Sequence, residues 1–97
     1  MELNDRDMSF TVKDFNKKYS DYIADGFYGL AISDEKVIYY LDKIFEELKT
    51  IYPSFICYQI KLKFGQAVVY MDNIPQDKIF EMEKNINELL KPNELIK

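Results

Sequence analysis

The chain has 97 residues, 47% of them hydrophobic and 15% aromatic, so one domain can form a core without metal or disulfide support. Thirteen basic and seventeen acidic residues give a net charge of −4, which disfavours direct binding to nucleic acid phosphates. The sequence contains no histidine and therefore lacks the commonest general base and the commonest metal ligand.

Cysteine usage and hydropathy predict a cytoplasmic protein. The single cysteine, Cys57, cannot form an intramolecular disulfide, and no signal peptide opens the sequence, so we expect a reducing environment. No apolar run approaches the length needed to cross a bilayer, and we therefore expect no membrane partner. The length predicts a single domain over residues 1–97, with mobile ends at 1–8 and 92–97.

The first third of the chain predicts a helix and a short strand. Ser9 or Thr11 can cap a helix over residues 12–23, whose apolar positions recur at spacings of three and four. An Asp-Gly pair ends this helix. The aromatic and apolar content of residues 27–32 allows a short third strand, although Gly29 weakens its interior.

Two further amphipathic helices are predicted on either side of a hairpin. Ser33 is the expected N-cap of a long helix whose apolar stripe repeats every three or four residues, and Pro53 stops it. Pro75 suits the start of the last helix, which Pro92 ends. Both helices carry charged residues on the side opposite the stripe, which is typical of a solvated face.

Residues 55–72 carry the strongest pattern in the chain, that of a β-hairpin. Alternation predicts one buried apolar face, made by Ile56, Tyr58, Ile60, Leu62 and Phe64. Cys57 then falls on the polar side. Gly65 permits a tight turn at Phe64–Gly65, and residues 67–71 form the second strand.

The register of this hairpin has two solutions in the sequence. The tight turn pairs apolar residues throughout: Leu62 with Ala67, Ile60 with Val69 and Tyr58 with Met71. A shift by one residue pairs Ile60 with Val68, which is also apolar. In either case the element order predicts an α+β fold, with a small antiparallel sheet packed with two or three helices.

The second face of the hairpin is the candidate partner-binding surface. In the favoured register it presents Gln59, Lys61 and Lys63 beside Val68 and Tyr70. An apolar and aromatic centre with a polar rim is a common composition of protein interfaces. The alternative is that the first helix or the 27–32 segment covers this face, since a two-stranded sheet usually needs cover.

The run Gln59-Ile60-Lys61-Leu62-Lys63-Phe64-Gly65, followed by Val69-Tyr70-Met71-Asp72, resembles a motif of small, uncharacterised phage and bacterial proteins. Their pattern is a Gly-aromatic segment, a helix ending near a Pro, the run Q-V-K-x-K-F-G-x-L-R-F-Y-x-D and a final amphipathic helix. Gly26-Phe27-Tyr28 and the flanking helices match in order, so the likeness spans about three quarters of the chain.

Two departures limit what this resemblance implies. Members often have a Cys-rich ending that would bind zinc, which this chain lacks, so no metal is implied. Val68 stands where the family has Arg, so no charged role is implied there. The resemblance implies a phage or mobile-element context and carries no activity or cofactor with it.

The chemistry-bearing residues predict no catalytic, metal or cofactor site. Cys57 has no histidine to serve as its base, and packing is the simpler interpretation of its role. Carboxylate pairs such as Glu46 and Glu47 lie on solvated helix faces. A small enzyme that uses carboxylates or Cys57 is the alternative. Acids and bases alternate along the helices, which disfavours nucleic acid mimicry by an acidic surface.

These observations predict a non-enzymatic protein-binding module. We expect a phage or mobile-element inhibitor of a bacterial defence protein, anti-CRISPR-like, that acts by stoichiometric binding. An immunity or antitoxin protein that neutralises a cognate toxin has the same physical profile. The expected partner is thus a protein, either a host defence protein or a toxin, with no direct contact to nucleic acid.

Overall fold

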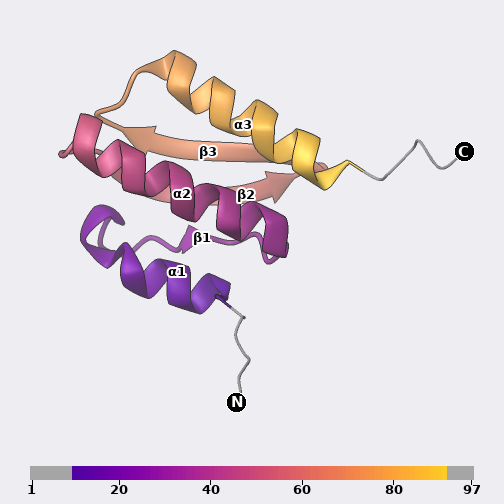
Figure 1. The fold of residues 1–97 in the computed structure, drawn as a ribbon, viewed down its shortest axis with the longest axis horizontal. Coiled ribbons are helices and arrows are strands. Elements are labelled where there is room, and N and C mark those ends of the chain that lie inside the picture. Colours follow the sequence, from indigo (N-terminus) through magenta and orange to yellow (C-terminus); the bar gives the residue numbers. More distant parts are fainter. Residues whose placement is uncertain (1–9, 92–97) are drawn as a thin grey trace, which may run out of the picture.

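The computed structural model describes residues 10–91. The elements, in chain order, are α1 (Val12–Lys18), a 3-10 helix (Ser20–Tyr22), β1 (Gly29–Leu30), α2 (Glu35–Ile51), β2 (Ile56–Lys63), β3 (Gln66–Asp72) and α3 (Gln76–Leu90) (Figure 1). The expected mobile ends, 1–8 and 92–97, and the alternative cap Ser9 lie outside the described residues. Over the described range, the predicted α+β fold is confirmed.

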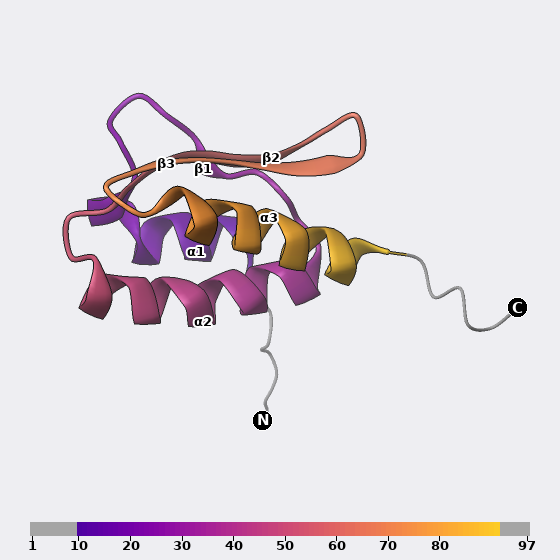
Figure 2. The ribbon, with the colours of Figure 1, turned by 90° about the horizontal axis from the view of Figure 1, so that it is seen from above.

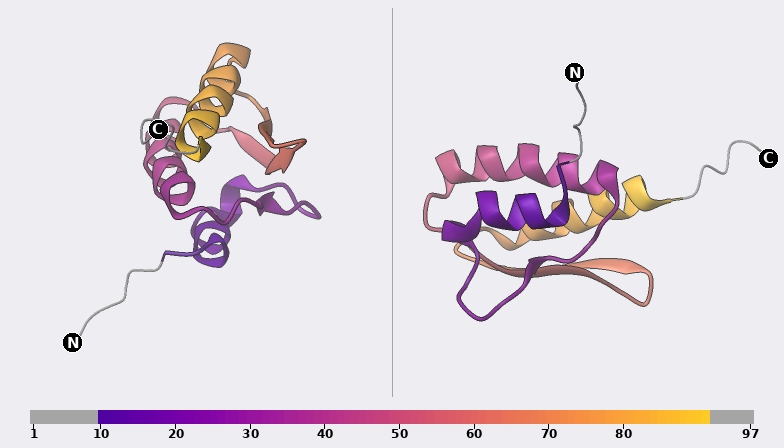
Figure 3. Two further views of the ribbon diagram at one scale, coloured as in Figure 1. Left: turned by 90° about the vertical axis from the view of Figure 1, so that its right-hand side faces the viewer. Right: turned by 90° about the horizontal axis from the view of Figure 1, so that it is seen from below.

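All three α-helices lie on the same side of the sheet (Figure 2). Helix α2 runs across the middle of the layer, with α1 next to β1 and α3 next to β3 (Figure 1). The loop before β1 projects beyond the sheet on the side away from the helices (Figure 3). The described chain therefore has two layers, and one face of its sheet is left without a helix.

The sheet is mixed, whereas the sequence predicts an antiparallel one. Strand β1 runs parallel to β2, and β2 runs antiparallel to β3. The chain crosses back through α2 between β1 and β2, so these two strands run in the same direction. The third strand predicted at 27–32 is present, but its strand geometry is restricted to two residues. Gly29 has a φ of +68°, and a Cβ there would lie 2.6 Å from the Asn16 side chain.

The register of the hairpin agrees with the favoured prediction only near the turn. The two apolar pairs closest to the turn form as predicted: Leu62 with Ala67 and Ile60 with Val69. A β-bulge at Tyr58 then shifts the pairing, so that Cys57 lies opposite Met71 in its place. The prediction that Cys57 lies on the polar side is wrong, because the bulge reverses the faces before it and buries Cys57 fully.

Side-chain caps set the starts of α1 and α2. Thr11 caps α1 in a reciprocal box with Asp14, whose carboxylate accepts from the Thr11 N–H at 3.0 Å. Asp34, and not the expected Ser33, caps α2, because its carboxylate accepts from the backbone N–H groups of Lys36 and Val37. Helix α1 is shorter than the predicted 12–23, since the chain turns back to the sheet, where Ile23 bridges to Cys57.

The core fills the space between the helices and the sheet. Four aromatic residues meet there with neighbouring ring centroids 4.8 to 5.2 Å apart: Phe15, Tyr19, Phe45 and Phe55. Leu41 and Leu48 of α2 are buried beside them, while Ile44 is half-buried.

Within residues 10–91, no helix combines the length and hydropathy that crossing a membrane requires.

Candidate functional site

The sheet face opposite the helices holds every residue that the sequence predicts for partner binding. We call it the outer face and define it by five residues: Gln59, Lys61, Lys63, Val68 and Tyr70. In the ladder between β2 and β3, Gln59 pairs with Tyr70 and Lys61 with Val68. All five follow the bulge along β2 or lie on β3, so strict alternation places their side chains on one side.

No described helix covers the outer face (Figure 2). The 27–32 segment reaches only its border: Gly29 and Leu30 lie beside β2 as the strand β1, and Phe27 packs against Tyr58. Tyr70 is 41% exposed and Lys63 is exposed, while Gln59, Lys61 and Val68 are half-buried. Of the two arrangements that the sequence allows for this face, the described residues adopt the open one.

Two aromatic residues that the sequence did not assign to the site border the outer face. Phe27 and Tyr58 meet edge to face, with ring centroids 5.0 Å apart. Together with Gln59, Lys61 and Tyr70 they line an open hollow of about 330 Å³, which we call the aromatic hollow. Alternation could not reveal Tyr58, because the bulge moves it across the strand, and Phe27 comes from a loop.

Backbone hydrogen bonds hold that loop at the border of the outer face. The Ala24 N–H donates to the Cys57 carbonyl at 3.0 Å, and the Phe27 N–H donates to the Ala24 carbonyl at 3.1 Å. Gly26, between them, has a φ of +82°, which a residue without a Cβ adopts at little cost. These contacts position the Phe27 ring against Tyr58.

The charge next to the aromatic hollow is positive. Lys61 Nζ lies 5.9 Å from the centroid of the Tyr70 ring, within cation–π range. The Tyr58 hydroxyl donates to the Asp72 carboxylate at 2.7 Å, and this bond raises the pKa of Tyr58. Among the described residues, neither Lys61 nor Lys63 lies within ion-pair distance of a carboxylate.

Helix side chains occupy backbone groups on both edges of the sheet. The Asn16 amide of α1 accepts from the Leu30 N–H at 2.8 Å and donates to the Leu30 carbonyl at 3.1 Å. Glu83 of α3 accepts from the Val69 N–H at 2.8 Å, and Asn87 does the same two residues earlier on β3. A partner strand would need these groups, so strand addition is disfavoured there.

The cysteine thiol and the ion-paired carboxylate of Glu46 both lie away from the outer face. Burial raises the pKa of the Cys57 thiol to about 12, so it stays protonated near neutral pH. Glu46 forms ion pairs with Lys18 and Lys49, each at 3.1 Å, on the helical side. In the described part of the chain, no group of three or more His, Cys, Asp or Glu residues could hold a metal ion.

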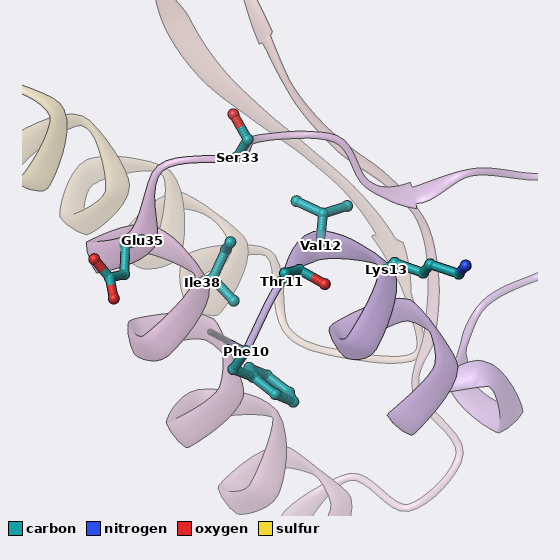
Figure 4. A pocket seen from close by; sticks show the side chains of 7 residues that line it. All are labelled: Phe10, Thr11, Val12, Lys13, Ser33, Glu35 and Ile38. Carbon is teal, nitrogen blue, oxygen red and sulfur yellow. The ribbon is translucent and has the colours of Figure 1, made fainter. Parts of the chain in front are cut away.

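A larger pocket of about 600 Å³ lies between the starts of α1 and α2 (Figure 4). Val12 and Ile38 supply apolar wall, and Lys13, Ser33 and Glu35 supply polar groups. In Figure 4 these three polar side chains point in different directions and do not converge. Ligand sites usually combine an apolar wall with a few convergent polar groups, so this pocket is a weaker candidate than the outer face.

Comparison with known proteins gives no assignment: no protein-family model, no curated protein and no solved structure matches this chain. The likeness to small phage and bacterial proteins therefore stays a prediction from the motif.

Proposed function

We propose that this chain is a non-enzymatic protein-binding module that contacts its partner through the outer face and the aromatic hollow. The observation that carries the proposal is an aromatic sheet face that no described helix covers. Exposed apolar patches rimmed by polar groups commonly mark interaction sites, and tyrosine is enriched at interface cores. Lys61, Lys63 and Gln59 supply the polar rim around Tyr70.

Four exposed aromatic residues lie on β3, in the loop before β1 and in the hairpin turn. Phe27 and Tyr28 come from the loop before β1, Tyr70 from β3 and Phe64 from the turn between β2 and β3. Their exposed fractions range from 41% for Tyr70 to 95% for Phe64. Large aromatic side chains contribute strongly to binding when a partner desolvates them, which favours contact by this side of the molecule.

The phage or mobile-element context that the motif implies is compatible with inhibition of a bacterial defence protein, which is the biological role we propose for this binding. A toxin-neutralising immunity protein is the second hypothesis, and it would act by the same occlusion of a partner surface. Gene neighbourhood separates the two hypotheses, because phage genes would accompany the first and a toxin gene the second.

Affinity capture with matched variants tests the proposed surface. Tagged full-length protein is incubated with bacterial lysate, in parallel with Tyr70→Ala, Lys61→Glu and the control Phe80→Ala. Phe80 is an exposed aromatic residue of α3, outside the outer face. We expect Tyr70→Ala and Lys61→Glu to lose the captured protein and keep the wild-type melting temperature, whereas Phe80→Ala keeps both.

Two results would contradict the proposal. Loss of capture only in Phe80→Ala would move the binding surface to the helices. Unfolding of Tyr70→Ala would mean that the outer face belongs to the core of the protein, and not to a contact surface.

A further inference from the structure

We infer that the aromatic hollow selects an acidic protein segment, in which one aromatic or aliphatic side chain enters the hollow and a neighbouring carboxylate pairs with Lys61. The inference rests on the proposed binding function and adds the chemistry of the partner. It follows from the shape of the hollow, from the charges around it and from the closed edges of the sheet.

The walls of the hollow suit one apolar side chain. Phe27 and Tyr58 form one aromatic pair of its lining and Tyr70 of β3 adds a third ring, and the volume of about 330 Å³ is at the lower end for ligand pockets. Gln59 lies between them, in register with Gly29 on one neighbouring strand and with Tyr70 on the other.

The charges around the hollow favour a carboxylate. The outer positions of β2 and β3 hold two lysines, Lys61 and Lys63, and one acid, Asp72, in a chain of net charge −4. Asp72 already accepts the hydrogen bond from Tyr58. Lys61 keeps its ammonium group near the Tyr70 ring, so a carboxylate could pair with it at the rim of the hollow without displacing that contact. Charges at the rim of an interface mainly set specificity and association rate.

A single-stranded nucleic acid offers a similar combination of ring and anion, but the net negative charge of this protein disfavours its binding. Phosphates repeat along such a strand, and affinity depends on neutralising several of them. The outer positions of the two strands offer two lysines on a protein of net charge −4. A peptide with one carboxylate next to one apolar side chain, in contrast, requires only a single lysine beside the hollow.

Peptide selection tests the inference with a defined probe. Short random peptides displayed on phage are selected on the full-length protein, and the enriched peptides are synthesised. Their affinities are measured for the wild type, Lys61→Glu and Tyr70→Ala at low and high salt. Lys43→Glu is the matched control, since it makes the same charge change at an exposed position of α2.

We expect enriched peptides to place Asp or Glu beside an aromatic or aliphatic residue. Lys61→Glu should weaken their binding by about fivefold or more at low salt, and by less at high salt, where salt screens the charge pair. Lys43→Glu should change their binding by less than about twofold. Tyr70→Ala should also weaken binding while the melting temperature is unchanged.

Three outcomes would overturn the inference. The first is that the enriched peptides are neutral or basic. The second is that the binding of none of the enriched peptides depends on Lys61. The third is that an oligothymidine strand binds more tightly than the peptides. Neutral peptides that still require Tyr70 would leave the proposed binding function standing and remove only the acidic specificity.

Discussion

The turn between β2 and β3 places a bulky side chain where the backbone favours glycine or asparagine. Phe64 has a φ of 54° and Gly65 a φ of 78°, and positive values at both central positions are the mark of a type I′ turn. A side chain with a Cβ in this conformation costs about 1–2 kcal/mol. Because Phe64 is 95% exposed, packing within the described protein does not offset that cost. Strain of this kind often persists at functional positions, which fits a contact role for the turn.

Substitutions in this turn should change stability in opposite directions. We expect Phe64→Asn to raise the free energy of unfolding by about 1 kcal/mol and Gly65→Val to lower it by about 1–2 kcal/mol. Space is not the reason, since no atom lies within 4 Å of a Cβ built at Gly65. Urea unfolding measures both effects. A Phe64→Asn variant no more stable than the wild type would show that the turn is not strained.

The short strand β1 depends on one helix side chain for its outer edge. Asn16 of α1 satisfies both the N–H and the carbonyl of Leu30, as a neighbouring strand would. It thereby joins α1 to the sheet and closes an edge at which another chain could pair. Nothing in the local sequence pattern distinguishes Asn16 from an ordinary polar residue of an exposed helix.

Removal of the Asn16 amide should destabilise the protein, although this side chain is only half-buried. We expect Asn16→Leu to lower the free energy of unfolding by about 1–3 kcal/mol, because both backbone groups of Leu30 lose their partner. Hydrogen exchange at the Leu30 amide should become faster. Lys17→Ala, at an exposed position of the same helix, is the control and should change stability by less than about 0.5 kcal/mol. Unchanged exchange at Leu30 in Asn16→Leu would contradict the role given to Asn16.

At the scale of the whole molecule, a polar network joins the end of α1 to α2. The buried Tyr19 places its hydroxyl 2.6 Å from the Asp42 carboxylate and 3.1 Å from that of Glu46. Lys18 pairs with both carboxylates. Hydrogen bonds from Lys49, Lys18 and Tyr19 lower the pKa of Glu46 from 4.5 to about 2. Because of this network, we expect part of the free energy of unfolding to depend on pH in the acidic range.

The sign of that dependence follows from the lowered pKa of Glu46. Between about pH 4.5 and pH 2, Glu46 binds a proton in the unfolded chain before it does so in the folded one, so acid favours unfolding. We expect its contribution to be complete above this window and to be lost as the pH falls through it. Melting temperatures across this range should fall less steeply for Glu46→Gln than for the wild type. Parallel pH profiles would mean that Glu46 does not contribute.

The sequence by itself determined the features that depend on neighbouring residues. Apolar spacings of three and four predicted α2 and α3, and the pattern around Phe64–Gly65 reduced the register of the hairpin to two alternatives, of which the structure adopts the favoured one near the turn. Alternation after the bulge placed Gln59, Lys61 and Tyr70 on one face, because side-chain direction along a strand repeats every two residues. These signals are local, so each can be found without knowledge of the rest of the chain.

Only the tertiary structure decided the features that depend on distant segments. The α2 crossover set the parallel direction of β1, and the bulge at Tyr58 exchanged the faces of Tyr58 and Cys57. The position of Phe27 at the hollow follows from the hydrogen bond between the Ala24 N–H and the Cys57 carbonyl, which joins two residues about thirty positions apart in the chain. Periodicity reports which side of an element is apolar, but not which distant backbone that side meets. Gln59, Lys61 and Tyr70 of the candidate site were therefore predictable from the sequence, whereas Phe27 and Tyr58 were not.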